Sequence, residues 1–144
     1  MIIKIPKIKH PGAVLIVPFI NPNKVVLLRQ YRPIVKKFLF EFPAGTLESK
    51  EKHLACARRE LIEEAGYTAT DMKKLGYIYP VPGYSTEKIV IYKASGLRPV
   101  KRCPEKDEII THQVINKARV RRLFKCGWIT DAKTICALAM CNWL

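Results

Sequence analysis

Three glutamates, Glu60, Glu63 and Glu64, are spaced three and four residues apart. On an α-helix these spacings place the side chains on one face, so the carboxylates are expected to lie close together. Like charges at this distance repel one another, and none of the three has a lysine four residues further along the chain. A divalent cation such as Mg²⁺ would remove the repulsion, because it prefers carboxylate oxygens as ligands. The alternative interpretation is a solvated acidic surface.

The distribution of acidic residues favours a metal site. The chain has 26 Lys and Arg but only 12 Asp and Glu, which gives a formal net charge of +14. Five of the twelve acids lie between residues 48 and 64, and three more, Glu105, Asp107 and Glu108, lie together. If the two segments meet in space, they form a single site. Its ligands would be oxygen atoms, because the cysteines and histidines do not have zinc spacing.

Hydrophobic patterning predicts the elements that would position these side chains. A helix is expected from about Ser49, its N-cap, to Ala65, ending at Gly66, with Leu54, Leu61 and Ala65 as its buried stripe. Two further helices are expected to close the chain, capped by Asn116 and Thr130. Strands are expected at 13–20 and 24–31, which form a hairpin, and at 38–42, 75–79, 87–94 and 109–115.

This order of elements indicates one domain over residues 1–144 with a mixed sheet covered on both faces. The composition, 49% hydrophobic and 26% charged, is that of a globular protein. No apolar run has the length of a membrane span and the N-terminal residues do not resemble a signal peptide, so a cytoplasmic location is expected. The five cysteines are expected to be reduced thiols.

Residues 45–67 resemble the Nudix box of the Nudix hydrolases. The match consists of Gly45, Glu51 and the run Arg59-Glu60-Leu61-Ile62-Glu63-Glu64-Ala65-Gly66-Tyr67. The resemblance implies an α+β fold, a Nudix-type α/β/α sandwich with a central mixed sheet, in which the box forms a loop–helix–loop. It also implies a hydrolase that uses Mg²⁺ or Mn²⁺ to cleave a nucleoside diphosphate linked to another group.

The resemblance also implies roles for individual residues. Glu60 and Glu64 look like the principal metal ligands, joined by the main-chain oxygen of Ala44. Glu63 looks like a further ligand or a carboxylate that orients water. Arg59 looks like the group that positions Glu60. Gly45 allows the backbone to come close, and Glu51 is expected to be structural.

In relatives that cleave ADP-ribose, a glutamate in a loop before the final strand accepts a proton or adds a metal ligand. Alignment on the following isoleucine places Glu105 at the base position and Asp107 at the nearby ligand position, with Glu108 as the reserve candidate. A solvated acidic turn is the alternative.

Segments outside the box look like the ADP-ribose pyrophosphatase group. They are EFPAGTLE, PVPGYSTE and ITDAKT. Pro82 lies where that group carries a proline, and Arg32 and Glu41 are the candidate substrate contacts. Tyr84 indicates the alternative of a dinucleoside polyphosphate hydrolase, and other nucleotide sugars also stay open. Only about a dozen residues precede the first expected strand, so the dimer and adenine contacts of that group are not carried over.

The expected partner is a small nucleotide, with no membrane and with a homodimer left open. The basic excess raises a different class of function, an RNA-binding or cap-processing Nudix protein. Most lysines are scattered, and only the segment 117–125 is dense in bases. Its apolar residues indicate an amphipathic helix with a solvated basic face, so nucleic acid is not the expected partner.

Overall fold

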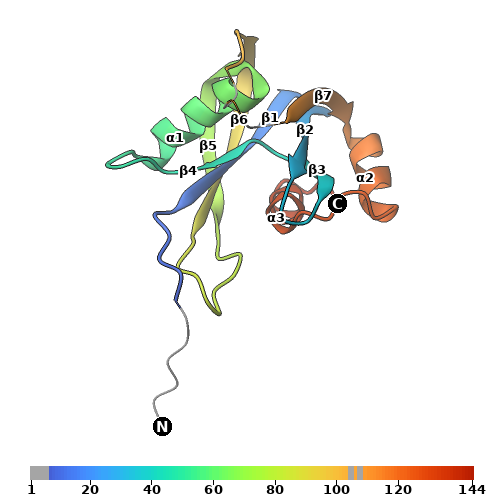
Figure 1. Cartoon of the computed structure of the whole chain (residues 1–144). Coiled ribbons are helices and arrows are strands. Elements are labelled where there is room, and N and C mark those ends of the chain that lie inside the picture. The colour runs from blue at the N-terminus through green and yellow to red at the C-terminus, as the bar shows by residue number, and fades with distance from the viewer. Residues whose placement is uncertain (1–6, 104–105, 107–108) are drawn as a thin grey trace.

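The computed structural model describes residues 7–103, 106 and 109–144 (Figure 1). Within these ranges β1 and β6 pair in parallel and the other strand pairs are antiparallel, so the sheet is mixed, as predicted. The strand order is β3-β2-β1-β6-β5, with β4 beside β1 and β7 beside β2. The elements are β1 Ala13–Asn21, β2 Lys24–Arg32, β3 Lys37–Glu41, β4 Ala44–Thr46, α1 His53–Glu60, the π-helix η1 Leu61–Ala65, β5 Tyr67–Ile78, β6 Ile89–Pro99, β7 Ile110–Asn116, α2 Lys117–Lys125 and α3 Ala132–Met140.

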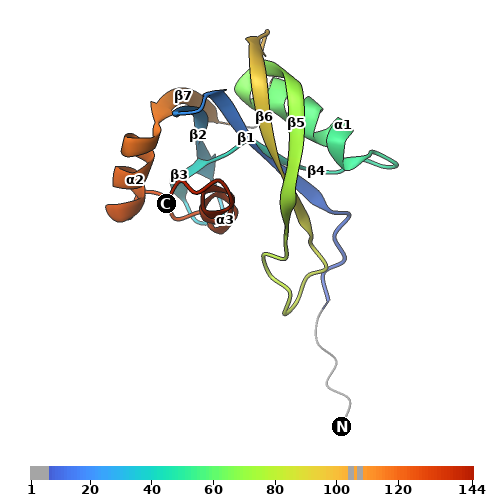
Figure 2. The ribbon, with the colours of Figure 1, turned by 180° about the vertical axis from the view of Figure 1, so that it is seen from behind.

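Strand β1 runs through the middle of the molecule, and its two faces contact different helices. Leu15 and Val17 belong to a core cluster that includes residues of α2 and α3. Val14 and Ile16 belong to a second cluster that includes residues of α1 and η1. Side chains alternate along a strand, so one apolar strand holds helices on both faces. Figures 1 and 2 show this arrangement from opposite sides, and the predicted α/β/α sandwich is confirmed.

The boundaries of two helices differ from the predictions. Lys50 has a φ of 61°, outside the helical region, so the first helix begins at His53 and not at Ser49. Leu54 is 42% exposed and is therefore not part of the buried stripe. In the last helix the predicted Thr130 cap is wrong, because Asp131 caps α3 by accepting from the Thr134 N–H at 3.0 Å. The predicted Asn116 cap of α2 is confirmed.

The structure also bears on the cysteines and on membranes. All five cysteines are free thiols, as predicted. In the described ranges, no helix has both the length and the apolar character needed to cross a membrane.

Candidate active site

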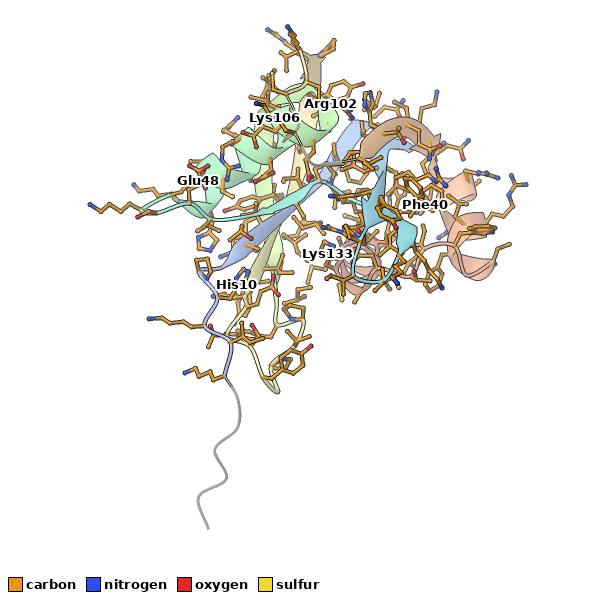
Figure 3. The ribbon with its side chains drawn as sticks, viewed as in Figure 1. His10, Phe40, Glu48, Arg102, Lys106 and Lys133 are labelled. Carbon is orange, nitrogen blue, oxygen red and sulfur yellow. The ribbon has the colours of Figure 1, made fainter. Side chains whose placement is uncertain are left out.

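A cavity of about 530 Å³ lies between the box helix and the start of α3. We call it the main cavity. Glu60, Glu63 and Glu64 line one wall, while Arg32 and Lys133 line another, with Asp131 beside Lys133. Figure 3 shows Lys133 near the middle of the molecule and Glu48 beside the start of α1. The cavity therefore presents both signs of charge to whatever enters it.

The acidic wall is built where the α-helix changes to a π-helix. Glu60 ends α1, and Glu63 and Glu64 belong to η1, which Gly66 terminates with a φ of 74°. Glu60 is 8% exposed and Glu64 is 3% exposed, so they do not form the solvated acidic surface that was the alternative. Single π-turns inside helices are frequent at functional sites. Burial of two carboxylates next to each other requires compensating contacts.

Strand β4 supplies two of those contacts. The backbone N–H of Ala44 donates to Glu64 Oε2 at 2.9 Å. Gly45 packs against the Glu60 side chain so closely that a Cβ at this position would overlap the carboxylate. The short strand thus fixes the position of both glutamates, and Gly45 is required by this close approach.

Arg59 connects the acidic residues to one another. Its Nη1 donates to Glu60 Oε1 at 2.7 Å and to Glu63 Oε2 at 3.0 Å. Its Nε and Nη2 donate to the two oxygens of Glu51 at 2.9 and 3.0 Å. These hydrogen bonds with Arg59 are the main reason why the pKa of Glu51 falls to about 2. Glu51 thus anchors the guanidinium group, which in turn holds two carboxylates of the wall.

Cys56 lies beneath this network. It is fully buried, and its thiol is 3.9 Å from the Gly45 oxygen and 3.7 Å from the Thr46 oxygen. Burial raises the pKa of this thiol to about 12, so it is neutral at physiological pH. Cys56 is therefore a small packing residue, not a nucleophile.

The Gly45 contact gives a first prediction. Gly45→Ala is expected to displace the Glu60 carboxylate, because the new methyl group occupies its place. The overlap reaches the Glu60 Cγ atom, and the displaced carboxylate must leave its hydrogen bond with Arg59, so the free energy of unfolding should fall by about 1–3 kcal/mol. The rate of hydrolysis should fall on the order of 10²-fold. Steady-state kinetics and thermal unfolding would be measured together. A variant with wild-type kcat would show that the position of Glu60 is unimportant.

The cationic wall depends on a buried carboxylate. Glu41 is 1% exposed and binds the Arg32 guanidinium through two hydrogen bonds of 2.8 and 2.6 Å. Lys133 Nζ lies 2.7 Å from the same carboxylate and 2.8 Å from Asp131. Burial alone would raise the pKa of Glu41, but Arg32 and Lys133 outweigh it and the pKa lies below its ordinary value. Both cations are thereby held at the cavity.

The sequence-predicted site residues are distributed as follows. Six of them line the main cavity: Arg32, Ala44, Arg59, Glu60, Glu63 and Glu64. Glu41 lies behind Arg32 and does not line it. Pro82 is exposed in a turn and does not line the main cavity. Pro80, two residues earlier, does line it. Glu105, Asp107 and Glu108 lie outside the described residues.

Sequence reasoning missed Lys133 and Asp131 as parts of the site. Both belong to ITDAKT, which was noted only as a segment that resembles a group of hydrolases. The signal that could have found them is an aspartate N-cap followed two residues later by a lysine. That spacing places the lysine in the first turn, beside the capping carboxylate.

Comparison with known proteins agrees with this geometry. The chain is 32% identical to "ADP-ribose pyrophosphatase" of Bacillus subtilis, over 91% of this chain and 72% of the relative. It is 35% identical, with the same coverage, to "Methanol dehydrogenase activator" of Bacillus methanolicus. It is 31% identical to "GDP-mannose pyrophosphatase" of Shigella flexneri, over 88% of this chain and 71% of the relative.

Among solved structures, the fold matches one described as "Crystal structure of ADP compounds hydrolase". The TM-score is 0.82 at 26% identity, over 91% of this chain and 70% of that chain. The family model described as the NUDIX domain matches residues 9–136, almost the whole of the sandwich. The chain belongs to this family and is a Nudix hydrolase.

Proposed function

We propose that the protein hydrolyses the diphosphate of a nucleoside diphosphate derivative with Mg²⁺ or Mn²⁺, and that ADP-ribose, cleaved to AMP and ribose 5-phosphate, is its substrate. The observation that carries this proposal is the pair of oppositely charged walls in the main cavity. A diphosphate bound to a divalent cation also carries both charges. The acidic wall is complementary to its cation and the basic wall to its phosphate oxygens.

The residues of the acidic wall fit a hard divalent cation. The donors that this wall contributes to the cavity are carboxylate oxygens of Glu60, Glu63 and Glu64, which is the chemistry that Mg²⁺ and Mn²⁺ prefer. In residues 7–103, 106 and 109–144, no three acidic, histidine or cysteine side chains already surround one point. We take Glu60, Glu64 and the Ala44 main-chain oxygen as the ligands from the resemblance to the Nudix box. The contacts of β4 with both glutamate side chains support this choice.

Each side chain then has a stated task. Arg59 holds Glu60 and Glu63 in place, and Glu63, whose side chain is 29% exposed, orients the attacking water. Arg32 and Lys133 bind phosphate oxygens, and Glu41 positions both cations. When bound, the metal neutralises diphosphate oxygens and lowers the pKa of water. Pro82 stays a proposed substrate contact only because the segment PVPGYSTE resembles that of ADP-ribose pyrophosphatases.

A base is needed to accept the proton of the attacking water. We assign this task to Glu105 and a ligand position to Asp107, from the sequence alone. If Glu105 is the base, Glu105→Gln should lower kcat strongly and leave KM nearly unchanged. A normal kcat there, with a large loss in Glu108→Gln, would move the role to Glu108.

A comparison of substrates tests the proposed function. With Mg²⁺, ADP-ribose should give a higher kcat/KM than GDP-mannose or a dinucleoside polyphosphate. ADP-ribose pyrophosphatase and GDP-mannose pyrophosphatase both occur among the relatives, so these two substrates are the sharpest contrast. Higher efficiency with GDP-mannose would make a nucleotide sugar the substrate. Preference for the dinucleoside polyphosphate would favour the interpretation based on Tyr84.

A further inference from the structure

A second pocket, of about 370 Å³, lies between β2, β3 and α2. We call it the α2 pocket; its lining is Arg29, Phe38, Phe40, Arg119, Arg122, Leu123, Cys126 and Trp128. Side chains alternate along β2, so Arg29 projects from the opposite face to Gln30 and Arg32, which line the main cavity. The α2 pocket is thus separated from the proposed hydrolytic site by the sheet. Figures 1 and 2 show α2 and α1 on opposite sides of the molecule.

Two aromatic side chains at this pocket are exposed to solvent. Trp128 is 65% exposed and Phe38 is 44% exposed. The position of Trp128 is fixed by the end of α2: Gly127 has a φ of 75°, and the Trp128 N–H donates to the Leu123 oxygen at 2.9 Å. This hydrogen bond and the one from the Gly127 N–H to Phe124 form a Schellman motif. The backbone therefore holds an exposed indole next to the pocket.

The cations of the α2 pocket differ from those of the main cavity in making no ion pair with a carboxylate of the described residues. Among the described residues, the ion pairs that involve arginine are made by Arg32 and Arg59 alone. Arg29 lies over the Phe38 ring, 4.1 Å from its centre, while Arg119 and Arg122 point from an exposed helix face. An apolar floor surrounded by three guanidinium groups is complementary to an anion with an aromatic part.

The basic surface continues along α2 beyond this pocket. Two further hollows lie next to the α2 pocket. One is bordered by Lys24, Asn116 and Arg119, and the other by Lys117, Arg121 and Lys125. Arg122 borders all three hollows. A row of hollows that share cations is suited to a chain of negative charges, and not only to one phosphate.

We propose that α2 and the α2 pocket bind single-stranded nucleic acid, with its phosphates along Arg119 and Arg122 and one base stacked against Trp128. The sequence alone favoured a solvated basic helix, since it does not show that Phe38 and Trp128 line one pocket beside that helix. The pocket has the volume of a small-ligand site and accommodates a single base. Stacking requires an unpaired base, so single strands bind in preference to duplex.

The test measures binding of a fluorescein-labelled twelve-nucleotide oligouridylate by fluorescence anisotropy at 150 mM salt. Arg119→Glu/Arg122→Glu should weaken binding at least about tenfold. The matched control is Lys73→Glu/Lys74→Glu, which makes the same change in charge at exposed positions of β5. The control should retain most of the affinity. Equal losses in the two variants would overturn the proposal, because net charge alone would then explain binding.

Trp128 provides the second readout. Trp128→Ala should weaken binding about tenfold and Trp128→Phe much less, because a stacked base contributes about 1–3 kcal/mol. In the wild type, bound oligonucleotide should quench the fluorescence of Trp128. In Trp128→Phe the only tryptophan is Trp143, which is 3% exposed, and its fluorescence should not change on binding. The proposal would be overturned if free AMP bound as tightly as the single strand. It would also be overturned if a duplex did so. The hydrolytic rate of Arg119→Glu/Arg122→Glu should equal that of the wild type, so failure here does not affect the proposed function.

Discussion

Glu64→Gln is expected to lower kcat for diphosphate hydrolysis on the order of 10³-fold while the protein stays folded. The glutamine oxygen can still accept the hydrogen bond from the Ala44 N–H, now 2.9 Å from Glu64 Oε2. The size of the side chain is also unchanged, so packing of this 3% exposed residue survives. What is lost is the negative charge that the proposed cation requires.

Glu48→Gln is the matched control for this variant. The Glu48 side chain is 70% exposed and lies 3.8 Å from Arg59, so its ion pair is weak. The rate of this control should change by less than about fivefold. Kinetics at saturating substrate and metal, with circular dichroism spectra of both variants, would separate the two outcomes. A Glu64→Gln enzyme with a tenth of the wild-type rate would place the cation elsewhere.

Glu41→Gln is expected to affect both stability and substrate binding. The free energy of unfolding should fall by about 2–3 kcal/mol, since a buried carboxylate that pairs Arg32 and Lys133 becomes an amide. KM should rise because an uncharged amide holds Arg32 and Lys133 at the cavity less firmly than the carboxylate does. Denaturant unfolding at pH 7 measures the first effect, and steady-state kinetics measures the second. Unchanged stability and KM would mean that Glu41 holds neither cation.

The pH dependence gives this variant an internal control. The pKa of folded Glu41 lies below its ordinary value of 4.5. Its contribution is therefore complete above pH 4.5 and is lost as the pH falls through the folded pKa. The difference in stability between wild type and Glu41→Gln should stay constant from pH 7 to pH 5 and decrease in more acidic solution. A difference that grows on acidification would contradict the ion-pair explanation.

The sequence predicted the elements that local patterning determines. The hairpin of β1 and β2, the Asn116 cap and the Gly66 stop all depend on residues close in the chain, and all are present. The start of α1 was misplaced because Ser49 is a good N-cap by residue type, whereas the left-handed conformation of Lys50 delays the helix. The π-turn of η1 has no signal in the hydrophobic pattern. The contacts that Glu60 and Glu64 make with β4 join residues far apart in the chain and have no such signal either.

The candidate site was predicted in its acidic half and missed in much of its basic half. Glu60, Glu63 and Glu64 are close in sequence, so helical spacing was enough to group them. Lys133 lies 92 residues beyond Glu41, and only the folded sheet brings their side chains together. A contact over such a distance cannot be read from spacing. Glu41 was predicted as a substrate contact from the resemblance to the ADP-ribose group. In the structure its carboxylate binds Arg32 and Lys133.

The most direct test of the account is the metal dependence of ADP-ribose hydrolysis by the purified protein. Activity would be measured after treatment with excess chelator and again after Mg²⁺ is restored, with products separated by chromatography. The account predicts no turnover in chelator and, with Mg²⁺, AMP and ribose 5-phosphate in equal amounts, because the carboxylate wall acts through a divalent cation. Full activity in excess chelator would contradict it.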